Sequence, residues 1–145
     1  VLLLACDCGF RKIIGVEFAP ELHEISTRNV ASWERDYRQA GRMETLCMDA
    51  TEFAIPPVPE VLFFHSPFTG RVMERVLGNV LTSFAAHPRK IMLVFYGNNS
   101  QSIDLLKAMK WPCRELALRA DWSRFTRFRS LIFTSPDTPG MPAHV

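Results

Sequence analysis

The sequence lacks a long hydrophobic run, a strong net charge and any paired arrangement of cysteines. No apolar run approaches the roughly 18 residues that a membrane-spanning helix needs, so no membrane partner is expected. The formal net charge is only +2 over 145 residues, which gives no electrostatic argument for nucleic acid, and none is expected as a partner. Internal repeats and low-complexity blocks are also absent. The length and composition are those of about one ordinary globular domain.

The four cysteines are scattered, without the paired spacing of a zinc site: Cys6, Cys8, Cys47 and Cys113. The Cys6-x-Cys8 arrangement is interpreted as chance combined with a buried helix face, and no metal site is predicted. Nothing indicates a disulfide framework. The expected compartment is therefore the reducing cytoplasm.

The chain begins with Val-Leu-Leu-Leu-Ala-Cys and not with Met. This apolar start has neither the charged lead of a signal peptide nor the polarity of a surface terminus. We therefore expect Val1 to mark a cut through a larger domain. Residues 1–8 are interpreted as the end of a helix, with Gly9 near its C-cap.

The order of elements predicts an α/β fold. Buried apolar runs predict four strands, at Ile13–Phe18, Met43–Met48, Glu60–His65 and Lys90–Tyr96. Helical spacing of apolar residues predicts helices at Glu21–Arg38, Arg71–Ala86 and Ser102–Met109. Two further β segments are expected, at Arg114–Leu118 and Phe125–Thr134. This alternation predicts an open, mostly parallel sheet with helices on both faces and an antiparallel strand at the C-terminus.

Two helices carry apolar stripes that we expect to face the core. The stripe of the first is Leu22, Ile25, Val30, Trp33 and Tyr37, and that of the second is Val72, Met73, Val76, Leu77, Val80, Leu81 and Phe84. Pro20 suits the first turn of the earlier helix. A Pro-rich tail, expected to be loose, begins at Ser135.

Polar or acidic side chains follow the predicted strands, at the edge where open parallel sheets bind their ligands. Glu17 ends an apolar strand, and Asp49 follows the next one. A carboxylate at such an edge can accept hydrogen bonds from both vicinal hydroxyls of a ribose. It can also be an ordinary edge carboxylate, or a charge that favours the dipole of the following helix. A Gly-rich dinucleotide turn, about 20 residues before such a carboxylate, would lie before Val1. The residues alone leave these interpretations open.

Taken together, four segments resemble a class I S-adenosylmethionine-dependent methyltransferase: IIGVEFAPELHEISTRN, CMDATEFAIPP, VLFFHSPFTGRVMERVLGNVLTSF and PRKIMLVFYGN. The similarity covers about Val1 to Asn99. It implies a Rossmann-like methyltransferase domain, incomplete at its N-terminus, over residues 1–134, with a tail over residues 135–145. It also implies S-adenosylmethionine as the cofactor.

The resemblance assigns roles to particular residues. Glu17 would hold the ribose hydroxyls, with Phe18 beside the adenosine. Asp49 would contact the adenine amino group, with Ala50 and Thr51 lining the ring. The substrate would lie beside the turn formed by Ser66, Pro67 and Phe68.

Ser66-Pro67-Phe68 is also similar to the [Asp/Asn/Ser]-Pro-Pro-aromatic turn of amino-group methyltransferases. In that turn the polar side chain and a backbone carbonyl hold the target nitrogen, and the aromatic ring stacks on it. Phe68 stands where the motif has its second Pro, so amine methylation is one alternative among several. His65 could serve as a base, or could be a half-buried histidine at a strand end.

The family's first strand and its Gly-rich loop have no match in the sequence. In the family's sheet that strand lies between the counterparts of Ile13–Phe18 and Glu60–His65. We therefore expect a gap or abnormal pairing there, and weak or absent binding of S-adenosylmethionine by these 145 residues.

Methyl transfer to an unidentified acceptor is the leading hypothesis. The alternative is a non-catalytic α/β remnant that acts as a binding or scaffolding module. A nicotinamide-dependent oxidoreductase would share the ribose carboxylate, but its pattern has no place for Asp49-Ala50-Thr51 or Ser66-Pro67-Phe68. The acceptor and the oligomeric state are not predicted.

One segment near the C-terminus interleaves arginines with aromatic residues: Arg119, Trp122, Arg124, Phe125, Arg127, Phe128 and Arg129. Arginine and aromatic side chains together serve phosphate binding and base stacking in RNA-binding proteins. The preferred interpretation is a final hairpin with one apolar and one solvated face.

Overall fold

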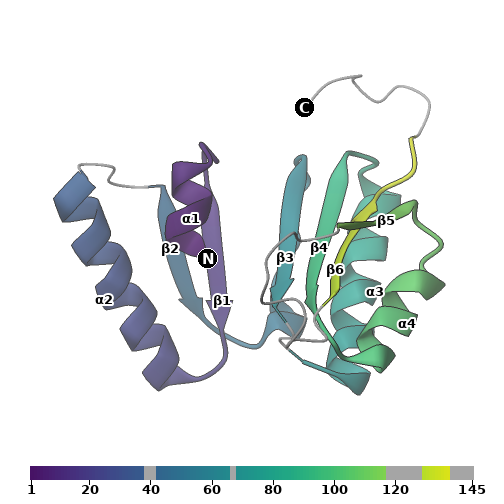
Figure 1. Ribbon diagram of the computed structural model, residues 1–145, viewed down its shortest axis with the longest axis horizontal. Helices are drawn as coiled ribbons and strands as arrows, with labels where there is room; N and C mark the ends of the chain where they lie inside the picture. Colours follow the sequence, from purple (N-terminus) through teal and green to yellow (C-terminus); the bar gives the residue numbers. More distant parts are fainter. Residues whose placement is uncertain (38–41, 66–67, 117–128, 138–145) are drawn as a thin grey trace. The chain divides into compact units, whose positions relative to one another are not determined.

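The computed structural model describes residues 1–37, 42–65, 68–116 and 129–137. The chain divides into two compact units, Val1–Phe53 (unit 1) and Ala54–Val145 (unit 2). Each unit has its own sheet, as Figure 1 shows. Among the described residues, none of the helices has the length and apolar character needed to span a membrane.

Outside residues 38–41, unit 1 forms two helices, two strands and a short 3-10 helix. They are α1 (Leu2–Asp7), β1 (Ile13–Glu17), α2 (Pro20–Tyr37), β2 (Met43–Cys47) and η1 (Ala50–Glu52). The predicted helix end is confirmed, because Gly9 follows α1 with a φ of +84° and its N–H bonds to the carbonyl of Cys6. Pro20 begins α2 as predicted.

The core of unit 1 lies between α1, α2 and the two strands. Its buried residues are Cys6, Ile13, Val30 and Met43, with Leu2, Leu3, Ala5 and Trp33 packed against them. Gly15 in β1 allows α1 to approach closely, because a Cβ at that position would lie 2.9 Å from Leu2 Cδ1. The predicted apolar stripe of α2 is wrong at its start, since Leu22 and Ile25 are 54% and 46% exposed.

The described residues of unit 2 form four strands and two helices. They are β3 (Glu60–His65), α3 (Gly70–Ala86), β4 (Ile91–Gly97), α4 (Ser100–Ala108), β5 (Cys113–Leu116) and β6 (Arg129–Thr134). The sheet order is β3-β4-β6-β5, with β3 parallel to β4 and both β4–β6 and β6–β5 antiparallel. The antiparallel β5–β6 pair agrees with the expected hairpin, whose residues 117–128 lie outside the described part of the chain.

The core of unit 2 lies on one face of its sheet. In β4, Ile91, Leu93 and Phe95 are fully buried, whereas the alternate residues are only half-buried. Figure 1 shows α3 and α4 on the same side of the sheet. The apolar stripe predicted for α3 is confirmed at its centre (Met73, Val76, Leu77 and Val80 are buried), but Val72 and Leu81 are exposed.

The predicted α/β class is confirmed, but the single sheet is not. The described strands form a two-stranded parallel sheet and a four-stranded mixed sheet, and β1 and β3 do not pair with each other. A gap between these two strands was one of the two expected outcomes. In unit 2 the described helices cover one face of the sheet.

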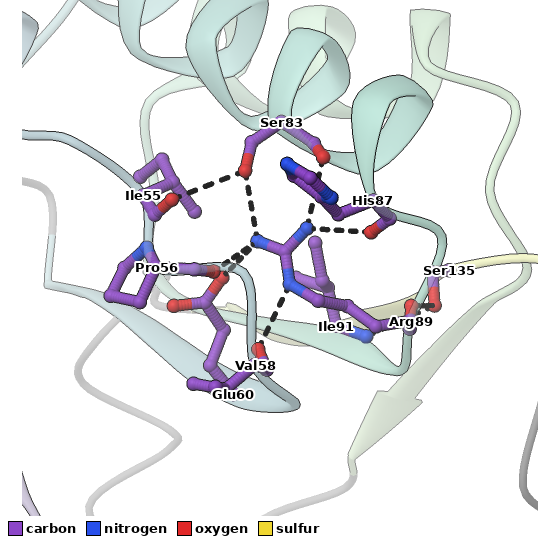
Figure 2. Close-up of polar contacts among 9 residues, drawn as sticks. All are labelled: Ile55, Pro56, Val58, Glu60, Ser83, His87, Arg89, Ile91 and Ser135. Atoms are coloured by element: carbon purple, nitrogen blue, oxygen red, sulfur yellow. Dashed lines mark hydrogen bonds and ion pairs between the residues drawn. The ribbon is translucent and has the colours of Figure 1, made fainter.

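A buried arginine connects the loop before β3 to the end of α3 (Figure 2). Arg89 is 5% exposed and donates hydrogen bonds to backbone carbonyls of the loop and of α3, those of Pro56, Val58, Ser83 and His87. It also donates to Ser83 Oγ at 3.0 Å and to Glu60 Oε1 at 2.9 Å. Because all three guanidinium nitrogens are used, the arginine is satisfied although it is buried.

The chain after β6 is held in place at its start. Ser135 is buried; its hydroxyl accepts a bond from the N–H of Ile91 and donates one to the carbonyl of Arg89, at 3.0 and 2.9 Å. Asp137 forms an ion pair with Lys90 at 3.0 Å. The expectation of a loose tail from Ser135 is therefore wrong for Ser135 itself, and residues 138–145 lie outside the described part.

Candidate functional site

Glu17 and Asp49 lie at the same edge of the sheet in unit 1. The strands β1 and β2 run in parallel with Glu17 opposite Cys47, and the N–H of Met48 bonds to the carbonyl of Glu17 at 3.1 Å. Asp49 follows Met48 directly. Both carboxylates therefore lie at the carboxyl ends of neighbouring parallel strands, which is where open α/β sheets bind ligands.

Glu17 has a local structural role at this edge. Its Oε1 accepts a hydrogen bond from the N–H of Ala19 at 2.9 Å, just before α2 begins at Pro20. A carboxylate in this position also favours the helix dipole. Capping therefore explains Glu17 without a ligand. The capping bond also leaves room for a ligand, because it occupies one of the roughly four lone pairs of the carboxylate.

Asp49 forms a tight turn after β2. Its Oδ1 accepts from the N–H of Thr51 at 2.8 Å, and its carbonyl accepts from the N–H of Glu52 at 3.0 Å. These bonds make Asp49 the N-cap of η1. Asp49, Ala50 and Thr51 are all half-buried. The turn fixes the backbone beside the carboxylate, as a preformed ligand edge requires.

Phe18 is the most exposed aromatic residue among the described part of unit 1. It follows β1 directly and is 75% exposed. A large apolar ring left in water is costly, at about 25 cal/mol per Å² of apolar surface. Phe18 is therefore available to cover the flat face of a ligand at this edge.

Two aromatic rings meet at the corresponding edge of unit 2. His65 ends β3, Tyr96 is the last residue but one of β4, and the two lie opposite each other in the parallel register. Their ring centroids are 5.4 Å apart, with an interplanar angle of 32°. His65 is exposed, and Tyr96 is half-buried. This arrangement gives the edge a flat surface that reaches solvent.

Of the three predicted substrate residues, Phe68 is described, and Ser66 and Pro67 lie outside the described residues. The Phe68 ring contacts that of Phe64 edge-on, with centroids 6.2 Å apart. Its carbonyl accepts a hydrogen bond from Ser102 Oγ at 3.3 Å. Gly70 follows with a φ of +56°, a left-handed conformation that glycine adopts without strain. Phe68 is thus held against both β3 and α4.

Ser102 is a residue that the sequence interpretation missed. It is fully buried, and its N–H donates to Asn99 Oδ1 at 2.8 Å, which makes Asn99 the N-cap of α4. Through its hydroxyl, Ser102 connects the start of α4 to the backbone of Phe68. The Asn-Ser-x-Ser sequence is a recognisable capping signal, but the contact with Phe68 spans 34 residues and has no local signature.

The structure thus places the predicted site residues in two groups. Glu17, Phe18, Asp49, Ala50 and Thr51 lie together at the carboxyl edge of the unit 1 sheet. Phe68 lies in unit 2, after the strand that ends at His65. The first group offers two carboxylates and an exposed ring, which suits a ligand with hydroxyl and amino donors and a flat face.

Comparisons with known proteins support the fold. No family model and no curated protein sequence matches the chain. Among solved structures, the chain is similar to one from Clostridium thermocellum that is provisionally named an rRNA-methylase, with a TM-score of 0.55. The two are 10% identical, and the match covers 88% of this chain and 74% of the other. At this identity the likeness shows the fold alone, a Rossmann-like methyltransferase fold.

Proposed function

We propose that the complete protein transfers a methyl group from S-adenosylmethionine to an acceptor. The observation that carries this proposal is the position of Glu17 and Asp49 at the ends of adjacent parallel strands. The similarity in fold to a provisionally named methylase supports it. Class, cofactor and reaction type remain proposals, because a fold at 10% identity does not specify a function.

In this proposal unit 1 holds the adenosine. Glu17 accepts hydrogen bonds from the ribose hydroxyls, and Asp49 accepts one from the adenine amino group. Phe18 covers the flat face, while Ala50 and Thr51 line the ring. The cofactor itself supplies an electrophilic methyl group, so the protein contributes binding and orientation.

The acceptor side of the proposal rests on the resemblance to the methyltransferase family. We assign the turn Ser66-Pro67-Phe68 to the substrate, and we propose that His65 takes a proton if the acceptor must lose one. Holding the acceptor in line with the methyl group supplies much of the rate by proximity. The provisional name of the similar structure makes RNA one of the acceptors to be tested.

Cofactor binding tests the proposal. In the complete protein, calorimetric titration with S-adenosylmethionine should show binding, and Glu17→Ala should weaken it about 10- to 100-fold, the value of a hydrogen bond to a charged group. Glu21→Ala is the matched control, because Glu21 is an exposed carboxylate in the first turn of the same helix. Equal losses in both variants, or no binding by the folded wild type, would refute the proposal.

A non-catalytic binding or scaffolding module is the second candidate. Two observations favour it: capping alone explains Glu17, and the described strands do not form one continuous sheet. The complete protein would then fold, fail to bind S-adenosylmethionine and still bind a partner. The same titration therefore separates the two candidates.

A further inference from the structure

The two units carry opposite charge, which the whole-chain value hides. Residues 1–53 contain six Lys or Arg and nine Asp or Glu, a net charge of −3. Residues 54–145 contain eleven Lys or Arg and six Asp or Glu, a net charge of +5. The unit with the proposed adenosine edge is acidic, and the unit with the proposed substrate turn is basic. The basic unit is thus suited to an anionic partner.

Ion pairing in unit 2 leaves the excess positive charge at the surface. Three of its five described carboxylates already form ion pairs: Glu60, Glu115 and Asp137. Five exposed cations form no ion pair with a described residue: Arg71, Arg75, Lys107, Lys110 and Arg114. Only Glu74 and Asp104 remain to balance them among the described carboxylates.

Arg71 and Arg75 are placed unfavourably for the stability of their own helix. They lie in the first two turns of α3, which has no acidic residue in its first turn. A cation in the first turn, here Arg71, opposes the helix dipole, and Arg75, four residues later, repels it. Helix stability therefore does not explain this pair, whereas attraction to an external anion would.

The same edge of the sheet carries exposed ring surface. α3 begins where the chain leaves β3, so Arg71 lies three residues after Phe68 and close to the edge formed by His65 and Tyr96. Arginines bind phosphates, and flat rings stack on unpaired bases. The carboxylates of an acidic peptide would pair with the arginines, but they would not stack on the rings.

We propose that this edge of unit 2, formed by His65, Phe68, Arg71, Arg75 and Tyr96, binds a single-stranded polynucleotide. The arginines contact its phosphates, and the rings contact its bases. This inference replaces the expectation, drawn from the whole-chain charge, that nucleic acid is no partner. It rests on the proposed function only in identifying the bound strand as the methyl acceptor.

The test is fluorescence anisotropy of labelled single-stranded RNA and DNA of mixed sequence, with the complete protein and without cofactor. Arg71→Glu/Arg75→Glu should weaken binding by ~10-fold or more. It should also reduce the slope of log K against log salt by about 1.4, for two phosphate contacts on a single strand. Circular dichroism and thermal unfolding of this variant and of the control below should match those of the wild type, so that loss of binding is measured on folded protein.

Lys107→Glu/Lys110→Glu is the matched control. It changes the same total charge, but α4 begins at the carboxyl end of β4 and runs away from it, so these lysines lie toward the opposite edge of the sheet. The control should retain most of the affinity. Equal losses in the two variants would show that only the overall charge of unit 2 matters, and would refute the site.

Two further arms complete the experiment. A preference for RNA or for DNA would assign the kind of strand, whereas equal affinity for polyglutamate would overturn the proposal because the rings would play no part. His65→Ala should weaken binding to the oligonucleotide more than to a phosphate-only polyanion. The oligonucleotide measurement contains no cofactor. Absence of oligonucleotide binding would therefore refute the polynucleotide site without deciding whether the protein binds S-adenosylmethionine.

Discussion

Arg89 and Glu60 form an ion pair, 2.9 Å from Nη2 to Oε1, that is almost entirely removed from water. Their side chains are 5% and 13% exposed. The pair joins the first residue of β3 to the loop between α3 and β4, and it anchors carbonyls of the loop before β3 (Figure 2). The pair lies at the end of β3 and β4 opposite to His65 and Tyr96, since Glu60 faces Ile91 at the start of the parallel register.

Arg89→Ala should be strongly destabilising. It leaves Glu60 buried without its cation and several carbonyls without a donor, and such a loss costs about 3–5 kcal/mol. Urea unfolding followed by circular dichroism measures it. Lys90→Ala is the control, because its ion pair with Asp137 is exposed and is worth less than about 1 kcal/mol. Similar losses of unfolding free energy in both variants would mean that the buried ion pair stabilises the fold no more than the exposed one.

Two glutamates should give stability opposite dependences on pH. Burial raises the pKa of Glu60 above 4.5, although Arg89 opposes the shift. The folded state then binds more protons than the unfolded state, so this contribution to stability is present at low pH and is lost as pH rises above 4.5. The hydrogen bond from Arg129 lowers the pKa of Glu115, so its contribution is present above 4.5 and is lost as pH falls below it.

The measurement is the free energy of unfolding between pH 3 and 7 for wild type, Glu60→Gln and Glu115→Gln. As pH rises, the stability of Glu60→Gln should increase relative to that of the wild type, because the variant lacks the contribution that the wild type loses. The stability of Glu115→Gln should decrease relative to that of the wild type, because the variant lacks the contribution that the wild type gains. Difference curves with the same sign for both variants would contradict the assignment.

Asn99→Ala should destabilise unit 2 by about 1 kcal/mol. The change removes the oxygen that accepts from the N–H of Ser102 at the start of α4. Asn98→Ala is the matched control, because Asn98 is exposed and precedes the cap. Thermal unfolding compares the two. A larger loss for Asn98→Ala would be inconsistent with the observed cap.

Gly15→Ala should destabilise unit 1 by about 1–3 kcal/mol, because the new Cβ would lie 2.9 Å from Leu2 Cδ1. Leu2→Ala on the same chain should recover part of this loss, since it removes the clashing methyl groups. A double-mutant cycle measured by urea unfolding gives the coupling. Coupling near zero would show that α1 does not pack on β1 in solution.

Much of the local structure followed from sequence pattern. Unbroken apolar runs gave the bounds of β3, and those of β1, β2 and β4 to within one residue at each end. Helical periodicity and Pro20 located α2, and Gly9 gave the end of α1. The positions of Glu17 and Asp49 at strand ends could be predicted because each is an acidic residue that ends or follows an apolar run.

Other features could not be predicted from the sequence pattern. The exposure of Leu22 and Ile25 could not be predicted, because periodicity shows which residues share a face but not how much of that face is covered. The burial of Arg89 and Ser135, two polar residues, could not be predicted because several of their partners lie about 30 to 45 residues away in the chain. The bond from the N–H of Ala19 to Glu17 is seen only in the structure, and it leaves the ribose interpretation open.

The sequence by itself determined the elements of this protein and the residue types at the strand ends, because propensity, periodicity and capping act over a few neighbouring positions. Only the tertiary structure decided that the strands form two sheets, that the charge divides between an acidic and a basic unit, and that Arg89 is buried. The reason is that strand pairing, burial and ion pairing join residues distant in the chain. Their energies depend on what the completed fold brings together.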